Sequence, residues 1–169
     1  MSERTVTFKG MPLALAGNEI KAGDKAPDFS AAANDMSPVS LKDFAGKVLI
    51  LCSVPSLDTP TCDLETRRFN QEAASLGADI QILTVSMDLP FAQARWCGAA
   101  GVTAVKTLSD HRLASFGQNY GVLIRDWRLL ARAVFVVGKD GVVAHAQIVS
   151  EIANEPDYAA ALTAAKALV

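Results

Sequence analysis

The sequence predicts an α/β fold with a central β-sheet of mixed strand direction and helices on both of its faces. Two observations support this fold class. Apolar segments typical of buried strands alternate with amphipathic segments typical of helices from residue 48 onward. Near the end of the chain, the turn Gly138–Gly141 joins two apolar segments directly and so supplies an antiparallel pair of strands.

Length and composition indicate one globular domain spanning residues 1–169. The chain is 50% hydrophobic and 20% charged, and it contains no repeat, low-complexity segment or linker. The net charge is -2 and there is no run of basic residues, so the sequence lacks the positively charged patch that nucleic-acid binding needs. We find no apolar run of membrane-spanning length and no signal-peptide pattern in residues 1–7, and we therefore expect a cytoplasmic protein.

The first elements are short. Thr5–Phe8 and Leu13–Leu15 flank a glycine and a proline, which predicts an N-terminal β-hairpin. Residues 28–33 predict a short strand, and residues 40–44 predict a brief helical turn before the central strand.

The central strand is Val48–Val54. It is apolar at six of its seven positions, which is typical of a strand buried on both faces. Pro55 ends it, because proline cannot donate a hydrogen bond within a sheet. Cys52 lies inside this strand and is interpreted as a core residue.

A helix is predicted next, from Pro60 to about Leu76, with Thr59 as its N-cap. Cys62 then occupies the third helical position, where unpaired backbone N–H groups and the helix dipole favour a thiolate. Because an N-cap hydroxyl characteristically reaches the third residue, we expect Thr59 to contact the sulfur. The alternative is that Cys62 is a small packed hydrophobic residue; a polar turn after a central strand favours a functional site.

The rest of the chain continues the alternation of strands and helices. The expected elements are a strand at 80–85, a helix that Asp88 caps and that Gly98 and Gly101 end, a strand at 105–108, a helix at 112–116, a strand at 129–137, a strand at 142–149 and a helix from about Asp157.

Two more residues are candidates for a functional site. Cys97 ends the second helix and is either a second thiol that attacks an oxidised Cys62 or a packed cysteine, and the spacing leaves both open. Arg132 lies in the apolar run 129–137 and needs an anionic partner if it is buried. A thiolate could be this partner, although Arg132 could instead point into water from a strand edge.

Other polar residues give weaker signals. Arg67 and Arg68 lie on the Cys62 helix, where one of them could approach the sulfur, but ordinary solvated positions are the simpler interpretation. His111 and His145 lie far apart and in no ligand spacing, so we expect neither a metal nor another cofactor, and a cysteine–histidine hydrolase is not favoured.

The residues around Cys62 resemble a known family. Pro55-x-x-x-Thr59-x-x-Cys62 resembles the peroxide-site motif of the peroxiredoxins, and Ser56–Cys62 is similar in detail to their thiol peroxidase subfamily. Further segments similar to that subfamily are Val6–Gly10, Met87–Ala92, Arg95–Gly98, Tyr120–Val122, Ala131–Ala133 and Glu155–Tyr158.

This resemblance implies a thioredoxin-like fold, a homodimer and an atypical 2-Cys peroxidase cycle for hydrogen peroxide and organic hydroperoxides. Cys62 would be the peroxidatic cysteine and become a sulfenic acid, and Cys97 would resolve it as an intrachain disulfide that thioredoxin reduces. Thr59 would hydrogen-bond the thiolate and the peroxide, Arg132 would stabilise the sulfur anion, and Pro55 would shield the pocket. The main alternative is a redox-sensing or binding module of the same fold.

Overall fold

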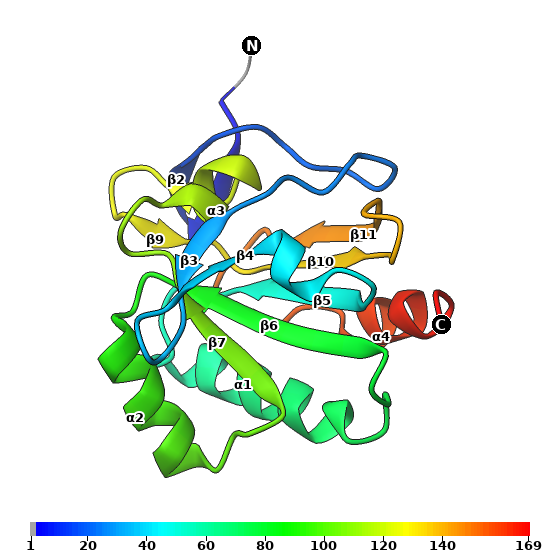
Figure 1. Ribbon diagram of the computed structural model, residues 1–169. Coiled ribbons are helices and arrows are strands. Elements are labelled where there is room, and N and C mark those ends of the chain that lie inside the picture. Colours follow the sequence, from blue (N-terminus) through cyan, green and yellow to red (C-terminus); the bar gives the residue numbers. More distant parts are fainter. Residues whose placement is uncertain (1–2) are drawn as a thin grey trace.

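A seven-stranded central sheet dominates the computed structural model, which describes residues 3–169 (Figure 1). The strand order is β11-β10-β5-β6-β7-β3-β4. Strands β5, β6 and β7 are parallel, whereas every other neighbouring pair is antiparallel, so the predicted mixed sheet is confirmed. The bounds are β3 Ser30–Ala32, β4 Pro38–Ser40, β5 Val48–Ser53, β6 Ile80–Ser86, β7 Val105–Ser109, β10 Ala133–Val137 and β11 Val143–Ile148.

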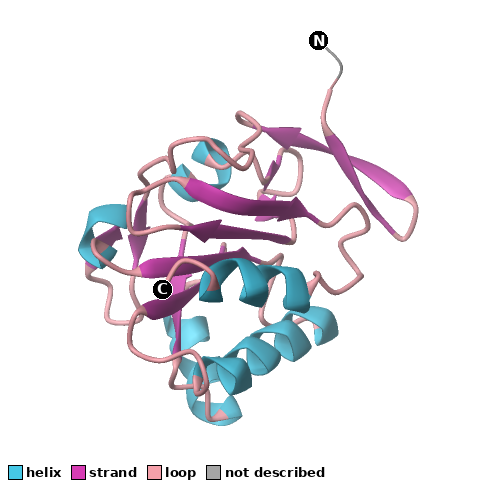
Figure 2. Cartoon of the chain, turned by 90° about the vertical axis from the view of Figure 1, so that its right-hand side faces the viewer, coloured by secondary structure: helices cyan, strands magenta, loops and turns pink. Residues whose placement is uncertain are grey.

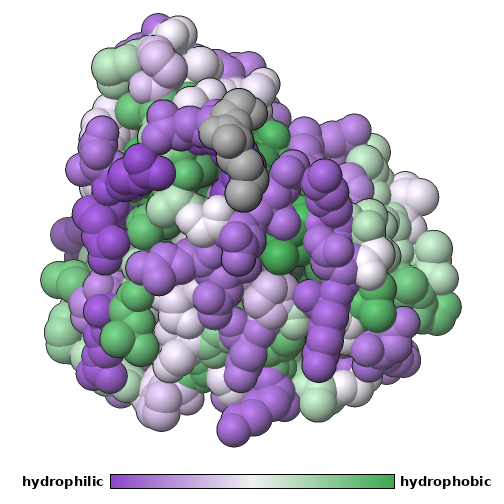
Figure 3. Space-filling model, turned by 90° about the horizontal axis from the view of Figure 1, so that it is seen from above, coloured by the Kyte–Doolittle hydropathy of each residue, from purple (hydrophilic) through white to green (hydrophobic). Residues whose placement is uncertain are grey.

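A second, four-stranded sheet contains the expected N-terminal hairpin. Its order is β1-β2-β8-β9, and all of its pairs are antiparallel. Its strands are β1 Thr5–Phe8, β2 Met11–Ala16, β8 Leu123–Ile124 and β9 Leu129–Leu130. Seen from above, the surface on this side of the molecule is mostly hydrophilic, with separate hydrophobic groups between the polar side chains (Figure 3).

Helices cover both faces of the central sheet, as predicted. The larger helices α1 Pro60–Ala73, α2 Pro90–Ala100 and α4 Tyr158–Lys166 lie on one face (Figures 1 and 2). The short α3 Ser115–Asn119 and the 3-10 helix η1 Leu41–Phe44 lie on the opposite face with the small sheet. No helix among residues 3–169 is long and apolar enough to cross a membrane.

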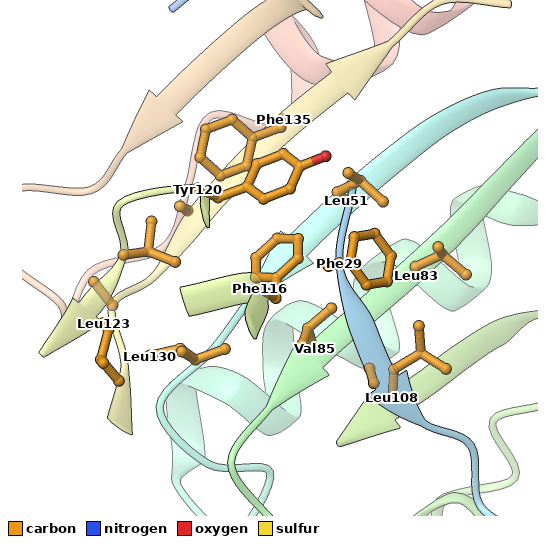
Figure 4. Close-up of a cluster of buried hydrophobic side chains, with 14 of the residues drawn as sticks. Phe29, Leu51, Leu83, Val85, Leu108, Phe116, Tyr120, Leu123, Leu130 and Phe135 are labelled. Atoms are coloured by element: carbon orange, nitrogen blue, oxygen red, sulfur yellow. The ribbon is translucent and has the colours of Figure 1, made fainter. Parts of the chain in front are cut away.

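The core is divided by the central sheet because successive strand residues face opposite sides. Leu49 and Leu51 of β5 pack on the α3 side, while Ile50 and Cys52 pack against α1 and α4. Every residue of β5 is buried, which confirms the expected central strand and the core position of Cys52. The α3 side is rich in aromatic rings (Figure 4), namely Phe29, Phe116, Tyr120 and Phe135.

The apolar run 129–137 is not one strand, contrary to the prediction. Leu129–Leu130 pairs within the small sheet, and Ala133–Val137 pairs with β5 in the central sheet. Most residues of the run are buried in both sheets, so the hydrophobic pattern does not reveal where the chain crosses from one sheet to the other. Ala131 and Arg132 make the crossing, and the Ala131 N–H donates to the Val122 carbonyl at 2.8 Å.

The predicted start of α2 was also wrong. Leu89, rather than Asp88, is the N-cap residue of this helix. The Asp88 carboxylate instead accepts a hydrogen bond from the Ser56 hydroxyl at 2.7 Å, and so supports the turn before α1. Gly98 lies within the helix, and only Gly101, with φ 68°, ends it in the left-handed conformation that glycine tolerates.

Two further helix boundaries differ from the predictions. Helix α1 ends at Ala73, three residues before the predicted Leu76. Helix α3 occupies 115–119 rather than 112–116, because Ala114 has φ 51° and cannot lie inside a right-handed helix. The buried Asp110 carboxylate accepts hydrogen bonds from two backbone N–H groups of α3 and fixes its start.

Candidate active site

The turn between β5 and α1 is held by polar contacts at its start and near its middle. The Ser53 hydroxyl, at the end of β5, donates to the Ala131 carbonyl at 2.7 Å. Within the turn, the Leu57 N–H donates to the Asp88 carboxylate at 2.8 Å. These contacts fix the point at which α1 begins and therefore the position of its first turn.

Cys62 is a reduced cysteine in this first turn, and its side chain is fully buried. It packs with Val54 and Leu57, and the half-buried Trp96 of α2 lies against this cluster. Packing is not its only interaction, because a guanidinium nitrogen of Arg132 lies 3.3 Å from the sulfur. The contact distinguishes Cys62 from an ordinary core cysteine such as Cys52.

Arg132 is 2% exposed and makes three contacts. Its Nη2 faces the Cys62 sulfur, its Nη1 donates to Glu65 Oε2 at 2.6 Å, and its Nε donates to the Ile152 carbonyl at 2.9 Å. The sequence left open whether Arg132 is buried or points into water, and the structure shows that it is buried. Burial lowers the pKa of Arg132, but the negative charges of Cys62 and Glu65 outweigh this effect and raise it above the ordinary value.

Glu65 is a residue of the site that the sequence analysis missed. It is 1% exposed and lies one helical turn after Cys62, on the same face of α1. Burial raises the pKa of its carboxyl group to about 7, although Arg132 opposes the shift. The sequence did contain a signal for Glu65. The spacing Cys62-x-x-Glu65 places the two residues on one helix face, and an arginine in an apolar run needs an anionic partner.

Thr59 and Pro55 lie beside this network and line a pocket. Thr59 is the N-cap of α1, as predicted, but its hydroxyl makes no capping bond and donates to the Ser56 carbonyl at 2.8 Å. Its expected hydrogen bond to the sulfur is therefore not present in this arrangement. The pocket has a volume of about 370 Å³ and is largely apolar, with Pro55, Thr59 and Arg132 joined by Phe8, Trp127, Leu129 and Ile152.

Cys97 is half-buried on α2 and has a different environment. Its sulfur lies 3.5 Å from the Thr107 hydroxyl on β7, and it packs with the core on the helical face of the sheet. The adjacent Trp96 donates from its indole N–H to Asp63 of α1 at 2.9 Å. The hydrogen bond between Trp96 and Asp63 thus links α1 and α2, although Cys62 and Cys97 pack in separate clusters.

The remaining candidates behave as ordinary surface or structural residues. Arg67 and Arg68 each pair with a carboxylate one turn away on α1, at Asp63 and Glu72. His111 shares a hydrogen bond with Ser109. Among residues 3–169, no group of three or more histidine, cysteine or acidic side chains has an arrangement that could hold a metal ion.

Comparison with known proteins identifies the family. The sequence matches the model of the Redoxin family over residues 21–162. The chain therefore belongs to the redoxin family. The thiol peroxidase of Halalkalibacterium halodurans is 57% identical over 163 residues, covering 96% of this chain and 98% of that protein. The thiol peroxidase of Bacillus subtilis is 56% identical over 164 residues, covering 97% and 98%. Within the family, these relatives confirm the resemblance to the thiol peroxidases.

Solved structures confirm the fold. A peroxiredoxin-like protein from Aquifex aeolicus has a TM-score of 0.92 at 40% identity, covering 98% of both chains. A thiol peroxidase from Chromobacterium violaceum has a TM-score of 0.84 at 20% identity, covering 94% of this chain and 93% of that chain. The predicted thioredoxin-like fold of the peroxiredoxins is therefore confirmed.

Proposed function

We propose that this protein is a thiol peroxidase in which Cys62 reduces hydrogen peroxide and organic hydroperoxides. The observation that carries the proposal is the contact of 3.3 Å between the Cys62 sulfur and the buried Arg132 guanidinium. A buried, permanently charged group beside a thiol favours the thiolate, which is the nucleophilic form. The family relationship with thiol peroxidases supports the same activity.

In the proposed first step, the Cys62 thiolate attacks the terminal oxygen of the hydroperoxide. A sulfur–oxygen bond forms, the oxygen–oxygen bond breaks, and the second oxygen leaves with the electron pair and takes a proton. Arg132 stabilises the charge that develops on the leaving oxygen. Thr59 lines the approach and orients the peroxide through its hydroxyl, and Pro55 limits the access of water.

In the second step, the Cys97 thiol attacks the sulfenic acid, releases water and forms an intrachain disulfide with Cys62. Disulfide geometry requires the two β-carbons to lie about 4 Å apart. The Cys97 contact with Thr107 and the Trp96 bond to Asp63 hold the reduced arrangement, so the ends of α1 and α2 must open locally. A thioredoxin-type dithiol then reduces the disulfide, and no metal or other cofactor takes part.

The first test is to add one equivalent of hydrogen peroxide to the reduced protein and to map its cysteines by mass spectrometry without reductant. A disulfide between Cys62 and Cys97 within one chain, with Cys52 still a thiol, is the expected product. A Cys62 that remains reduced would overturn the proposal. Oxidation at Cys62 without turnover by thioredoxin would instead favour a redox sensor.

The same proposal includes the organisation of the protein. We infer that residues 1–169 act as a single domain, that two copies form a homodimer, and that the cycle operates in the cytoplasm, where dithiol reductants are available. The family resemblance supports the dimer. Sedimentation of the reduced protein at twice the chain mass of 17.9 kDa is the expected result.

A further inference from the structure

The Cys62 site contains one cation and two groups that can become anions. Arg132 lies between them, with one guanidinium nitrogen on the Cys62 sulfur and another on Glu65 Oε2. All three side chains are at most 2% exposed. If both acids were ionised, this buried cluster would carry a net negative charge, which is costly away from water.

The surroundings of Glu65 oppose its ionisation. Its Oε1 is buried and has no hydrogen-bond partner among the described residues. The other titratable groups that face it are all acids: Cys52 on β5, Glu155 before α4 and Tyr158 on α4. Arg132 is therefore its one favourable partner in the described part of the chain, and Arg132 is shared with Cys62.

We propose that Glu65 holds a proton while Cys62 is a thiolate and releases this proton when peroxide reduction consumes the thiolate charge. The inference rests on the proposed function, in which Cys62 becomes a sulfenic acid. Because Glu65 acts through Arg132 and does not contact the sulfur, it is a positioning residue that also stores a proton. A pKa of about 7 for its carboxyl group allows both protonation states near neutral pH.

The step balances in atoms and charge. The thiolate and the hydroperoxide form a sulfur–oxygen bond, and the oxygen–oxygen bond breaks. The leaving oxygen departs with the electron pair and takes up one proton, giving water or an alcohol, while Glu65 releases one. Cys62 ends as a neutral sulfenic acid, and Glu65 ends as a carboxylate paired with Arg132. The net charge of the three side chains is zero before and after the reaction.

This exchange also explains how Arg132 stays paired during the second step. When Cys62 leaves to form the disulfide with Cys97, a buried guanidinium without an anion would be strongly destabilising. The ionised Glu65 remains at 2.6 Å and replaces the lost thiolate charge. When the Cys62 sulfur moves away, the buried Arg132 therefore still has an anionic partner in Glu65.

Infrared difference spectroscopy tests the proton directly. In the C97S background, which stops the reaction at the sulfenic acid, peroxide is added at pH about 6, below the carboxyl pKa. We expect a protonated-carboxyl C=O band to disappear and a carboxylate band to appear. Glu65→Gln should abolish both signals. Glu72→Gln is the matched control on the same helix, since Glu72 pairs with Arg68 near the surface, and it should retain both.

The outcomes separate this inference from the proposed function. If mass spectrometry shows oxidised Cys62 but the carboxyl band does not change, or if the change persists in Glu65→Gln, the proton inference is wrong and the peroxidase proposal stands. If Cys62 is not oxidised, both are wrong.

The pH dependence of the reaction gives a second, independent readout. As the pH rises through about 7, Glu65 ionises and its charge competes with the thiolate for Arg132. The rate of Cys62 oxidation in the wild type should then fall, by up to about tenfold for each pH unit. Glu65→Gln keeps a hydrogen-bond acceptor for Arg132 without the charge, so its rate should not fall. Parallel profiles for the two proteins would contradict the inference.

Discussion

The two helices that carry the candidate cysteines start alike but are held differently. Each follows a parallel strand and has a proline at its first position. Helix α1 buries Cys62, Glu65, Thr66 and Phe69, and its cysteine contacts a buried cation. Helix α2 fully buries Pro90 and Gln93, and its half-buried cysteine packs against the core and makes one weak polar contact, with a hydroxyl.

The difference indicates which helix moves when the disulfide forms. A nucleophile works best in a site fixed before the substrate arrives, as Cys62 is by Arg132. A resolving thiol must travel, and a helix with few buried residues opens at low free-energy cost. We therefore expect α2 to open more extensively than α1. Hydrogen exchange that increases on oxidation around Cys97, and less around Cys62, would support this.

The largest effect should come from removing the mobile thiol. Cys97→Ser should leave the first reaction with peroxide within about twofold of wild type, because Cys97 does not contact the Arg132 network. Turnover with thioredoxin should be lost, and a sulfenic acid should accumulate at Cys62. Rapid mixing followed by trapping with a sulfenic-acid reagent measures both. Cys52→Ala is the control and should keep its turnover; a disulfide in the C97S protein would contradict the assignment.

The charged network around Cys62 should also affect stability. The folded state raises the pKa of Glu65 from 4.5 to about 7, so it binds the proton more tightly than the unfolded chain does. This contribution is fully present below pH 4.5 and is lost as the pH rises to about 7. The free energy of unfolding should fall across this range by on the order of 3 kcal/mol.

Urea unfolding at several pH values measures this contribution. Glu65→Gln should flatten the pH dependence, and Glu72→Gln should follow the wild type. A slope that is identical in the wild type and Glu65→Gln would show that Glu65 is ionised in the folded protein.

Arg132→Lys tests whether the shape of the guanidinium matters. A lysine keeps the charge but cannot contact the sulfur, Glu65 and the Ile152 carbonyl with one planar group. The rate of peroxide reduction should fall by about tenfold to a hundredfold, which corresponds to one lost charge-assisted hydrogen bond. Arg125→Lys, at an exposed pair with Glu3, should be unchanged. Equal rates for Arg132→Lys and wild type would mean that charge alone is sufficient.

The sequence predicted the features that depend on local pattern. The buried strand β5, Thr59 as the N-cap of α1 and the hairpin β10–β11 each follow from hydrophobic period or turn residues. The family resemblance, rather than periodicity, indicated the thioredoxin-like fold. The roles of the candidate site residues remain predictions.

Features that depend on long-range contacts were not predictable in this way. The break between β9 and β10 was missed because both halves of the run are apolar and largely buried, in two different sheets. Glu65 was overlooked because a glutamate on a helix is usually solvated, and only the approach of Arg132 from a distant segment shows its role. The Asp88 carboxylate binds the turn before α1 rather than capping α2, and the sequence around Asp88 does not indicate this distant contact.

The smallest expected effect concerns the tie between the two helices. The Trp96 indole N–H donates to Asp63 at 2.9 Å, and this bond must break if α2 opens alone. Trp96→Phe keeps an aromatic ring against the Cys62 cluster but removes the donor, which should cost about 1 kcal/mol. If opening limits the second step, the Cys62–Cys97 disulfide should form about fivefold faster, while the first reaction with peroxide stays unchanged.

Quenched-flow mass spectrometry measures both steps in one experiment. Phe91→Leu is the control, because Phe91 is 69% exposed on the same helix and touches neither cysteine cluster. A disulfide that forms at the wild-type rate in Trp96→Phe would mean that opening of α2 does not limit resolution. The slow event would then lie in α1, where release of Cys62 from Arg132 is the remaining barrier, and the comparison between the two helices would be reversed.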